Sequence, residues 1–332
     1  MRSMTHPQAP VKVLKIAGLG RSGSTILDIA LGNHPSIESV GEVGNLMRTG
    51  WVSRGSLHGI ERKKRRVPLC TCGKRLDVLY VGSPEEACPF WSEVRREWVE
   101  RTSDLNGEGI EGYPRLQDAF ERQRRWPRLL YEGLLGPSAA FRSYAALTLA
   151  FFESIRAVSG KPFVVDSATV PAHAYAFGMV PGMELYVVHL VRDGRGVITS
   201  NRKTFKKERR AGMWKTVARW ISLNLTAEWV CASLGPKKTL RLRYEDFVSD
   251  PDAALSRIGS LLGLDLSGVA EAARAGEPML AGHNVGGNRT KKSGAITLRP
   301  DAREWKSDLS AAEQRLAWVS MGWLMRRYGY ER

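Results

Sequence analysis

The sequence predicts an α/β fold in which helices cover both faces of a mainly parallel sheet, giving three layers. Apolar runs bounded by turn residues alternate with helical patterns, and the first of these runs passes through a glycine-rich turn directly into a helix. With 332 residues, of which 43% are hydrophobic and 25% charged, the chain can bury a large core. We expect a single domain over residues 1–332.

The expected elements follow from the same patterns. Strands are predicted at 12–19, 36–40, 163–166, 185–192 and 239–243, and helices at 24–32, 171–177, 194–202, 213–234, 251–262 and 311–328. The helix at 251–262 opens on Asp250-Pro251, a typical start because proline suits the first helical turn. Residues 48–161 are mostly helical and basic in pattern, and we expect a helical insertion that covers the active-site edge of the sheet.

The turn after the first strand has the spacing of a P-loop, G-x-x-x-x-G-K-[ST], from Gly18 to Thr25. Free backbone N–H groups and the helix dipole make such a turn a phosphate-binding site. Ser24 stands where nucleoside triphosphatases carry their lysine, and Arg21 lies inside the loop. This pattern disfavours ATP hydrolysis and favours a nucleotide with one 5′-phosphate-like group, in an α/β/α fold of the P-loop type.

A second motif lies at the end of the strand 185–192. Arg192 would sit at the carboxyl end of a parallel strand, where open α/β sheets bind ligands. Ser200 follows about two helical turns into the next helix, so it can face the same pocket. A guanidinium beside a hydroxyl suits a second, separate phosphate.

Together these segments resemble the sulfotransferase family, and the tyrosylprotein-type and bacterial branches most closely. The resemblance rests on GLGRSGSTIL followed by HPSIESVGE, on VVHLVRDGRGVITS, and on Tyr244-Glu245-Asp246-Phe247. It continues in HNVGGN at 283–288, followed by Asp301 and Trp305, and so runs from residue 18 to 305 apart from most of the insertion.

The resemblance implies 3′-phosphoadenosine 5′-phosphosulfate as donor and adenosine 3′,5′-bisphosphate as product. The acceptor would be a hydroxyl on a small molecule, glycan or lipid, attacking sulfur in line. Arg192 and Ser200 would hold the 3′-phosphate, with Lys291 at the position of a further basic residue and Arg289 and Lys292 beside it. The 5′-phosphosulfate would be held by the loop residues Gly20, Arg21, Ser22, Gly23, Ser24 and Thr25.

Glu42 is the expected base, because the Gly-Glu pair after the second strand matches the catalytic glutamate of the tyrosylprotein branch. Arg21 would stabilise charge on the sulfuryl and bridging oxygens. His173 is the rival base and a candidate substrate contact, whereas His34 and His189 look like turn and sheet residues. Bacterial relatives often carry DSSK or DKSP where this chain has Asp166-Ser167-Ala168-Thr169, so the lysine of that segment is missing.

A net charge of +16 indicates anionic partners, and the basic run 202–215 makes an anionic acceptor one candidate. One alternative is a P-loop small-molecule kinase, which should show the missing lysine and a metal-binding aspartate at a strand end. A basic nucleic-acid-binding protein is the alternative from another class, but no helix-turn-helix, zinc-finger or RNA-binding signature is visible. We therefore expect no nucleic-acid partner, and the oligomeric state is open.

The cysteines bear on metal binding, and the lengths of the apolar runs bear on where the protein is located. Cys70, Cys72 and Cys88 form a local cluster with His58 as a candidate fourth ligand, but their spacing matches no standard zinc pattern. We expect no metal, and either a small thiol cluster or a Cys72–Cys88 disulfide formed on isolation. The sequence shows no secretory signal and no apolar run of membrane-spanning length, so a cytoplasmic protein is expected.

Overall fold

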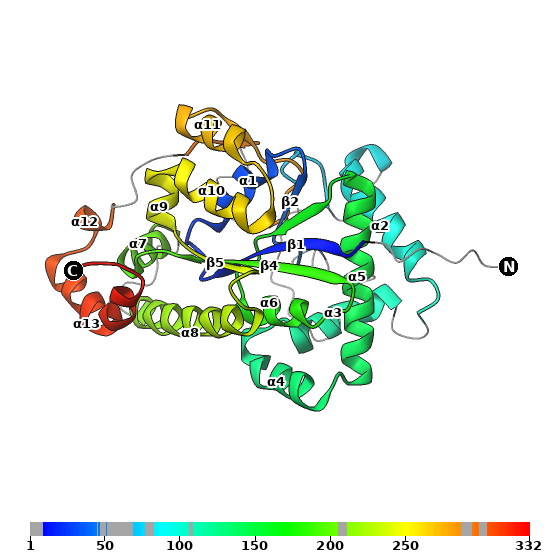
Figure 1. The fold of residues 1–332 in the computed structure, drawn as a ribbon, viewed down its shortest axis with the longest axis horizontal. Coiled ribbons are helices and arrows are strands. Elements are labelled where there is room, and N and C mark those ends of the chain that lie inside the picture. Colours follow the sequence, from blue (N-terminus) through cyan, green and yellow to red (C-terminus); the bar gives the residue numbers. More distant parts are fainter. Residues whose placement is uncertain are drawn as a thin grey trace.

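The computed structural model describes residues 9–44, 46, 51, 69–76, 83–105, 109–204, 211–286, 294–298 and 304–332. Its centre is a parallel five-stranded sheet in the order β2-β3-β1-β4-β5 (Figure 1). The strands are β1 (Val11–Gly18), β2 (Ile37–Gly41), β3 (Phe163–Asp166), β4 (Met183–Val191) and β5 (Thr239–Arg243). Each expected strand is present, and the parallel sheet is confirmed.

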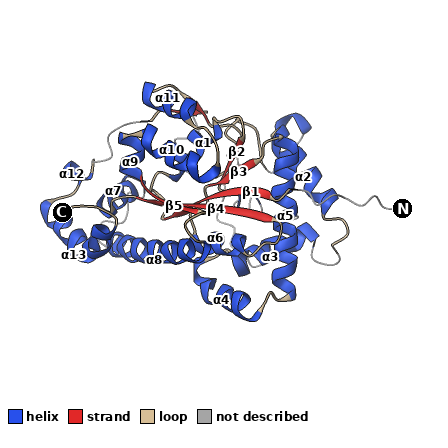
Figure 2. Cartoon of the chain, viewed as in Figure 1, coloured by secondary structure: helices blue, strands red, loops and turns tan. Residues whose placement is uncertain are grey.

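Helices cover both faces of the sheet, so the three-layer prediction is confirmed (Figures 1 and 2). β1 shows why: Leu14 and Ile16 pack in one apolar core, whereas Val13 and Ala17 pack in another. The first face carries α1 (Ser24–Gly32), α10 (Pro251–Leu262) and α11 (Ser267–Ala275). The second carries α5 (Ala139–Ser159), α6 (Pro171–Gly178) and α8 (Ala211–Leu234).

The carboxyl end of β4 leads into a third cluster of helices. This cluster holds α7 (Gly194–Thr204), α12 (Trp305–Asp308) and α13 (Ala311–Arg327), which pack together with the start of α8. α9 (Tyr244–Ser249) follows β5 directly, as α7 follows β4. A short antiparallel pair, β6 (Met279–Leu280) and β7 (Ala295–Ile296), lies beside α1.

Between β2 and β3 the described residues are mostly helical, with turns and isolated β-bridges at 69–76. This region contains η3 (Pro84–Glu86), α2 (Pro89–Arg101), α3 (Gly109–Phe120), η4 (Gln123–Arg125), α4 (Trp126–Leu135) and α5. Its buried tryptophans Trp51, Trp91 and Trp98 pack against one another as core. The extent of the insertion, 48–161, stays a prediction. Within the described residues, no helix combines the length and the apolarity needed to cross a bilayer.

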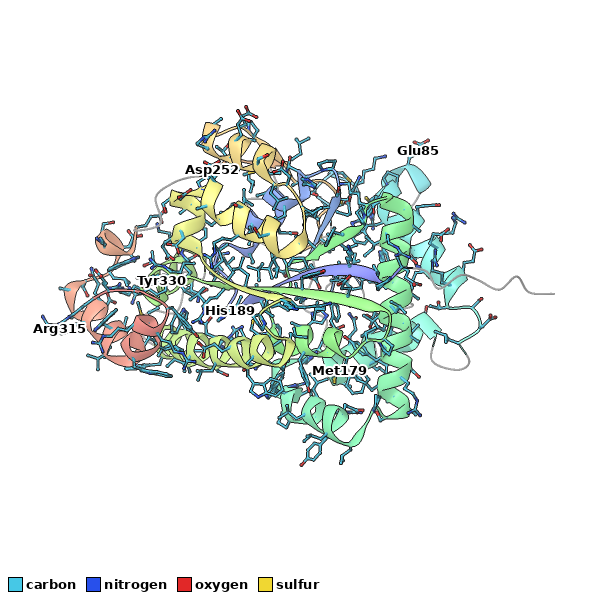
Figure 3. The ribbon with its side chains drawn as sticks, viewed as in Figure 1. Glu85, Met179, His189, Asp252, Arg315 and Tyr330 are labelled. Atoms are coloured by element: carbon cyan, nitrogen blue, oxygen red, sulfur yellow. The ribbon has the colours of Figure 1, made fainter. Side chains whose placement is uncertain are left out.

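His189 is buried in β4, within the body of the molecule (Figure 3), as the sequence predicts for a sheet residue. Its Nε2 lies 2.9 Å from Asn224 Oδ1. The pKa of His189 is lowered to about 4, mainly by burial and to a smaller extent by nearby Arg241, while the Asn224 hydrogen bond opposes the shift. The folded protein therefore holds this imidazole neutral at a pH where the unfolded chain is already protonated.

This shift predicts that the free energy of unfolding falls on acidification. Because the unfolded chain binds the proton more tightly, stability is lost from about pH 6.5 down to about pH 4, by about 3 kcal/mol from this group. Urea unfolding of wild type and His189→Gln across this range measures the difference in slope. The partly buried His34 provides the comparison variant His34→Gln, which shows how far the loss of a different imidazole changes the slope. Parallel curves for wild type and His189→Gln would contradict the prediction.

Candidate active site

The loop between β1 and α1 has the geometry of an anion-binding turn. Gly23, just before the helix, has φ 91°, and Arg21 has φ 78°, the only positive φ of a non-glycine residue among those described. Ile26 and Leu27 donate the first hydrogen bonds back onto the loop, both to the Gly23 carbonyl. The N–H groups of the residues before Ile26 therefore precede the helical hydrogen bonding, and the N-cap residue Gly23 has no side chain to cap them.

Glycine is required at position 23 because a side chain there has no room. A Cβ atom would lie 2.1 Å from a ring carbon of Tyr244, and the left-handed backbone disfavours other residues. Ser22, Ser24 and Thr25 are buried along the same turn. The structure thus places the predicted loop residues Gly20 to Thr25 on one tight, closely packed turn.

Arg192 and Ser200 converge on this loop, although they lie more than 170 positions away in the sequence. Arg192 Nη1 donates to the Arg21 carbonyl at 3.1 Å, and Arg21 Nε donates to Ser200 Oγ at 3.0 Å. Burial lowers the pKa of Arg21, and the positive charge of Arg192 lowers it further. Two guanidinium groups held this close repel each other, and an anion between them would relieve the repulsion.

One nitrogen of the Arg192 guanidinium makes no hydrogen bond among the described residues. Arg192 Nε is buried and has no hydrogen-bond partner within the described part of the chain. The guanidinium also stacks over the Tyr244 ring, 4.6 Å from its centroid, and Gly196 leaves it room. A buried donor of this kind is available to hydrogen-bond a bound anion.

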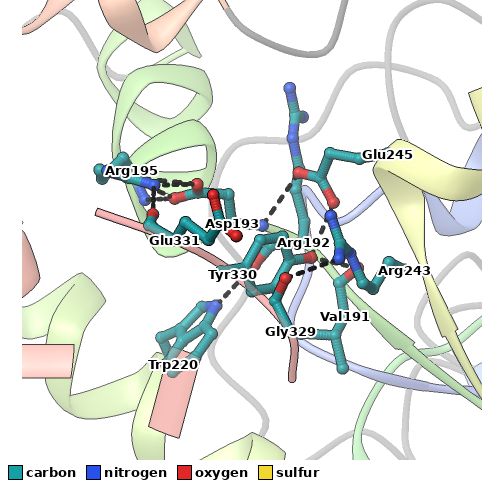
Figure 4. A network of polar contacts seen from close by, with 10 residues as sticks. All are labelled: Val191, Arg192, Asp193, Arg195, Trp220, Arg243, Glu245, Gly329, Tyr330 and Glu331. Atoms are coloured by element: carbon teal, nitrogen blue, oxygen red, sulfur yellow. Dashed lines mark hydrogen bonds and ion pairs between the residues drawn. The ribbon is translucent and has the colours of Figure 1, made fainter. Parts of the chain in front are cut away.

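The rest of the Arg-Asp-Gly-Arg motif holds the turn in place instead of facing the site (Figure 4). Arg195 donates through Nε and Nη2 to the Asp193 carboxylate, and its Cζ lies 3.7 Å from the centroid of the Trp305 ring. Glu245 accepts from the Asp193 N–H and from the Tyr330 hydroxyl. Burial raises the pKa of the Glu245 carboxyl. These contacts fix the direction in which Arg192 leaves β4.

A buried polar cluster lies on the α5/α6 side of the sheet, around Lys15 of β1. Lys15 Nζ lies 2.6 Å from Asp166 Oδ2 and 2.9 Å from His173 Nδ1. His173 Nε2 in turn lies 3.3 Å from Glu121 Oε1. Burial lowers the pKa of Lys15, while Asp166, Glu121 and Glu42 oppose the shift in that order.

Glu42, the predicted base, follows β2 at the carboxyl end of the sheet. Its N–H donates to the Val285 carbonyl at 2.7 Å, and the Val285 N–H donates to Val40. Gly41 between them has φ 76°, and a Cβ there would lie 2.3 Å from the Val285 oxygen. The segment after His283 therefore pairs with the backbone that carries Glu42.

The lysine missing from the Asp166 segment has a counterpart that sequence reasoning did not find. Lys15 brings a buried ammonium to Asp166 from the neighbouring strand, at the register Lys15↔Asp166. The sequence offered one signal for this contact: Lys15 is a charged residue within a predicted strand that is otherwise apolar. Glu121 had no such signal in the sequence. Arg289, Lys291 and Lys292 lie outside the described residues, as does His58.

A cavity of about 340 Å³ opens beside the loop, between α7 and the start of α8. Four basic residues line it: Arg21, Arg202, Lys215 and Arg219. Arg202 is partly neutralised by Glu313, 2.6 Å away. The cavity is therefore basic and continuous with the anion-binding turn.

Fold and site define an α/β protein whose polar groups gather at the carboxyl end of a parallel sheet. Within this class, a sequence model of the "Sulfotransferase family" matches residues 89–268, more than half of the chain. The chain belongs to the sulfotransferase family. A search of curated protein sequences finds no match.

One solved structure agrees in fold, and a second is reported beside it. The sulfotransferase domain of the Synechococcus PCC 7002 olefin synthase is 17% identical, with a TM-score of 0.53 over 99% of this chain and 98% of that domain. Sulfotransferase STF9 from Mycobacterium avium is 13% identical, with a TM-score of 0.47 over 97% of this chain and 78% of that chain. At these identities the first likeness supports the fold alone, and it agrees with the predicted fold class.

Proposed function

We propose that this protein transfers the sulfuryl group of 3′-phosphoadenosine 5′-phosphosulfate to an acceptor hydroxyl. Family membership supports sulfuryl transfer in general. The observation that carries the choice of donor is the convergence of Arg21, Arg192 and Ser200 on the loop before α1. Two separate cationic groups at one loop suit a nucleotide that bears two separate anionic groups.

The residues present fit this donor. The turn from Ser22 to Thr25 would hold the 5′-phosphosulfate through its N–H groups and the helix dipole. Arg192, with its unpartnered Nε, and Ser200 would hold the 3′-phosphate. When bound, the donor supplies a sulfuryl group on a good leaving group, adenosine 3′,5′-bisphosphate.

The chain's own part in the reaction is positioning, charge stabilisation and proton removal. Arg21 would stabilise negative charge on the oxygens around sulfur, because it already lies in the loop beside Arg192. Glu42 would take the proton of the attacking hydroxyl. Its backbone is fixed by Val285, so the carboxylate is presented from an ordered strand end.

His173 is the weaker candidate for the base. Its Nδ1 faces the Lys15 ammonium and its Nε2 faces the Glu121 carboxylate, so both ring nitrogens meet a charged partner. A lysine ammonium can only donate, so Nδ1 accepts from Lys15 and the ring proton then sits on Nε2, which makes no hydrogen bond within the described residues. Neither nitrogen then has a free lone pair to take a proton from an incoming hydroxyl. We infer that His173 holds the Lys15 cluster together and that Glu42 acts on the acceptor.

The basic cavity beside Arg21 favours an acceptor, or a part of one, that carries negative charge. Lys215 and Arg219 are exposed on α8 and line the cavity without contributing to the loop. Their charges would attract an anionic group and increase its association rate at low salt. The acceptor class proposed is therefore an anionic hydroxyl compound.

Isothermal titration tests the donor assignment. Adenosine 3′,5′-bisphosphate should bind about 10-fold tighter or more than ADP or AMP, because only it carries the 3′-phosphate. Equal affinity for all three would contradict the assignment. Preference for ADP in the presence of Mg²⁺ would instead support a P-loop kinase.

A further inference from the structure

Three cysteines and a histidine meet in a cluster outside the site described above. The sulfur atoms of Cys70, Cys72 and Cys88 and a ring nitrogen of His283 all lie within 4.8 Å of one another. His283 Nδ1 lies 3.3 Å from Cys88 Sγ and 3.7 Å from Cys70 Sγ. The histidine comes from far along the chain, so the pattern is invisible in the local sequence.

These separations are close to those of zinc ligands. A tetrahedron with Zn–S near 2.3 Å and Zn–N near 2.0–2.1 Å places its ligand atoms about 3.5–3.8 Å apart. Three thiolates and one imidazole are also a common donor set for structural zinc. We propose that Cys70, Cys72, Cys88 and His283 bind one Zn²⁺ ion.

The backbone places the ligands in advance of any metal. Cys70 N–H donates to the Lys74 carbonyl at 2.8 Å, and Gly73, with φ 84°, closes the turn by donating to the Cys70 carbonyl. Cys88 N–H donates to the Arg75 carbonyl at 2.9 Å. These backbone hydrogen bonds hold the cysteines so that their sulfur atoms lie close together, as the hydrogen bonds around a metal site hold its ligands.

Two contacts, one to the ring and one to the backbone, hold His283 in place. Its ring stacks on Phe90 with centroids 5.0 Å apart and planes only 7° from parallel. Its carbonyl accepts from Trp91 Nε1 at 2.6 Å. The imidazole is therefore held with Nδ1 directed at the sulfur atoms of Cys70 and Cys88.

A disulfide is the competing interpretation. All four cysteines of the chain are free thiols in this structure, including the pair Cys72 and Cys88 considered from sequence. A disulfide between any two would use two of the four groups and leave the contact of the imidazole with two sulfur atoms unexplained. A four-ligand metal site accounts for all of them.

The proposed metal would be structural, because four protein ligands fill the tetrahedron and leave no open position for substrate. It would join the two cysteine-bearing segments 70–76 and 83–88 to the segment 281–286. The two are already linked by Thr71, whose hydroxyl donates to the Gly282 carbonyl and accepts from the Asn284 N–H. Since Val285 pairs with the backbone of Glu42, the metal would brace the strand end that carries the proposed base; this consequence rests on the proposed function.

Metal analysis of the purified full-length chain tests the site. Wild type saturated with Zn²⁺ under reducing conditions and then desalted should retain about one zinc per chain. Cys88→Ser should retain less than about a fifth of that. Cys231→Ser, which changes the one cysteine outside the cluster, should retain the wild-type amount. Saturation with Co²⁺ should give thiolate charge-transfer and tetrahedral d–d absorption in wild type and Cys231→Ser only.

Cys72→Ser keeps the test decisive if Cys88→Ser fails to fold, because Cys72 is exposed and its removal leaves the core intact. Wild type that retains no more zinc than Cys72→Ser would overturn the proposal. So would equal loss from Cys231→Ser, or a Cys72–Cys88 disulfide found by mass spectrometry in metal-saturated protein. Because none of these measurements uses enzyme activity, they stand apart from the test of donor binding.

Discussion

Arg192→Ala should weaken the binding of adenosine 3′,5′-bisphosphate by about 100-fold and leave ADP binding nearly unchanged. The reason is the unpartnered Arg192 Nε, which we assign to the 3′-phosphate that ADP lacks. Arg192→Lys should be intermediate, because lysine keeps the charge but cannot form two parallel hydrogen bonds. Isothermal titration of both nucleotides against each variant measures the change in selectivity.

A matched arginine controls for net charge. Arg96 on α2 is exposed and its ion pairs within the described residues are all with glutamates of its own helix, so Arg96→Ala should bind both nucleotides as wild type does. Arg192 also donates to the Arg21 carbonyl, so thermal unfolding of the variant should be recorded beside the titrations. A folded Arg192→Ala protein that still prefers the bisphosphate over ADP as strongly as wild type would contradict the assignment.

Glu42→Gln should lower kcat by about 10²–10⁴-fold while adenosine 3′,5′-bisphosphate binds as before. Glutamine keeps the shape of the side chain and the N–H bond to Val285, so the strand end stays in place. What it loses is the ability to accept the proton of the hydroxyl. The assay compares an aliphatic alcohol acceptor, found by screening the wild type, with nitrophenol as a second acceptor.

The comparison of acceptors separates proton removal from a structural effect. 4-Nitrophenol is far more acidic than an aliphatic alcohol and is ionised at a mildly alkaline assay pH, so its reaction needs little help from a base and Glu42→Gln should lose far less activity with it. Glu38→Gln, on the same strand and paired with Lys161, serves as the control and should keep most of its kcat. An equal loss with both acceptors, or a larger loss in His173→Gln, would count against Glu42 as the base.

Local sequence patterns were enough to predict the fold. Apolar runs bounded by turn residues, the helix start at Asp250-Pro251 and the glycine turn at 18–25 predicted elements that the structure confirms within a few residues at each end. These signals work because each depends on residues that are close in sequence: the apolar run itself, the residues at a helix start, and a glycine with a left-handed backbone. The predicted three-layer arrangement followed from the order of those elements.

Contacts between segments that lie far apart in the sequence were harder to predict. Lys15 was part of a predicted strand, yet its partner Asp166 became clear only once β1 and β3 paired in register. Arg195 and Asp193 resemble site residues by position, but the structure turns them toward Trp305 and the C-terminal segment. The sequence also offered His58 as a fourth ligand for the cysteines, whereas His283 is the histidine that lies among them.

By itself, the sequence determined the family, the order of the elements and the loop residues that would hold a phosphate. Those properties depend on short sequence motifs, in which a few adjacent residues determine the chemistry. The tertiary structure alone decided that Arg192 and Ser200 meet Arg21, that Lys15 neutralises Asp166, and that His283 joins three cysteines. Long-range pairing follows from how strands register and helices pack, and no local pattern specifies which distant side chains then come within a few ångströms of each other.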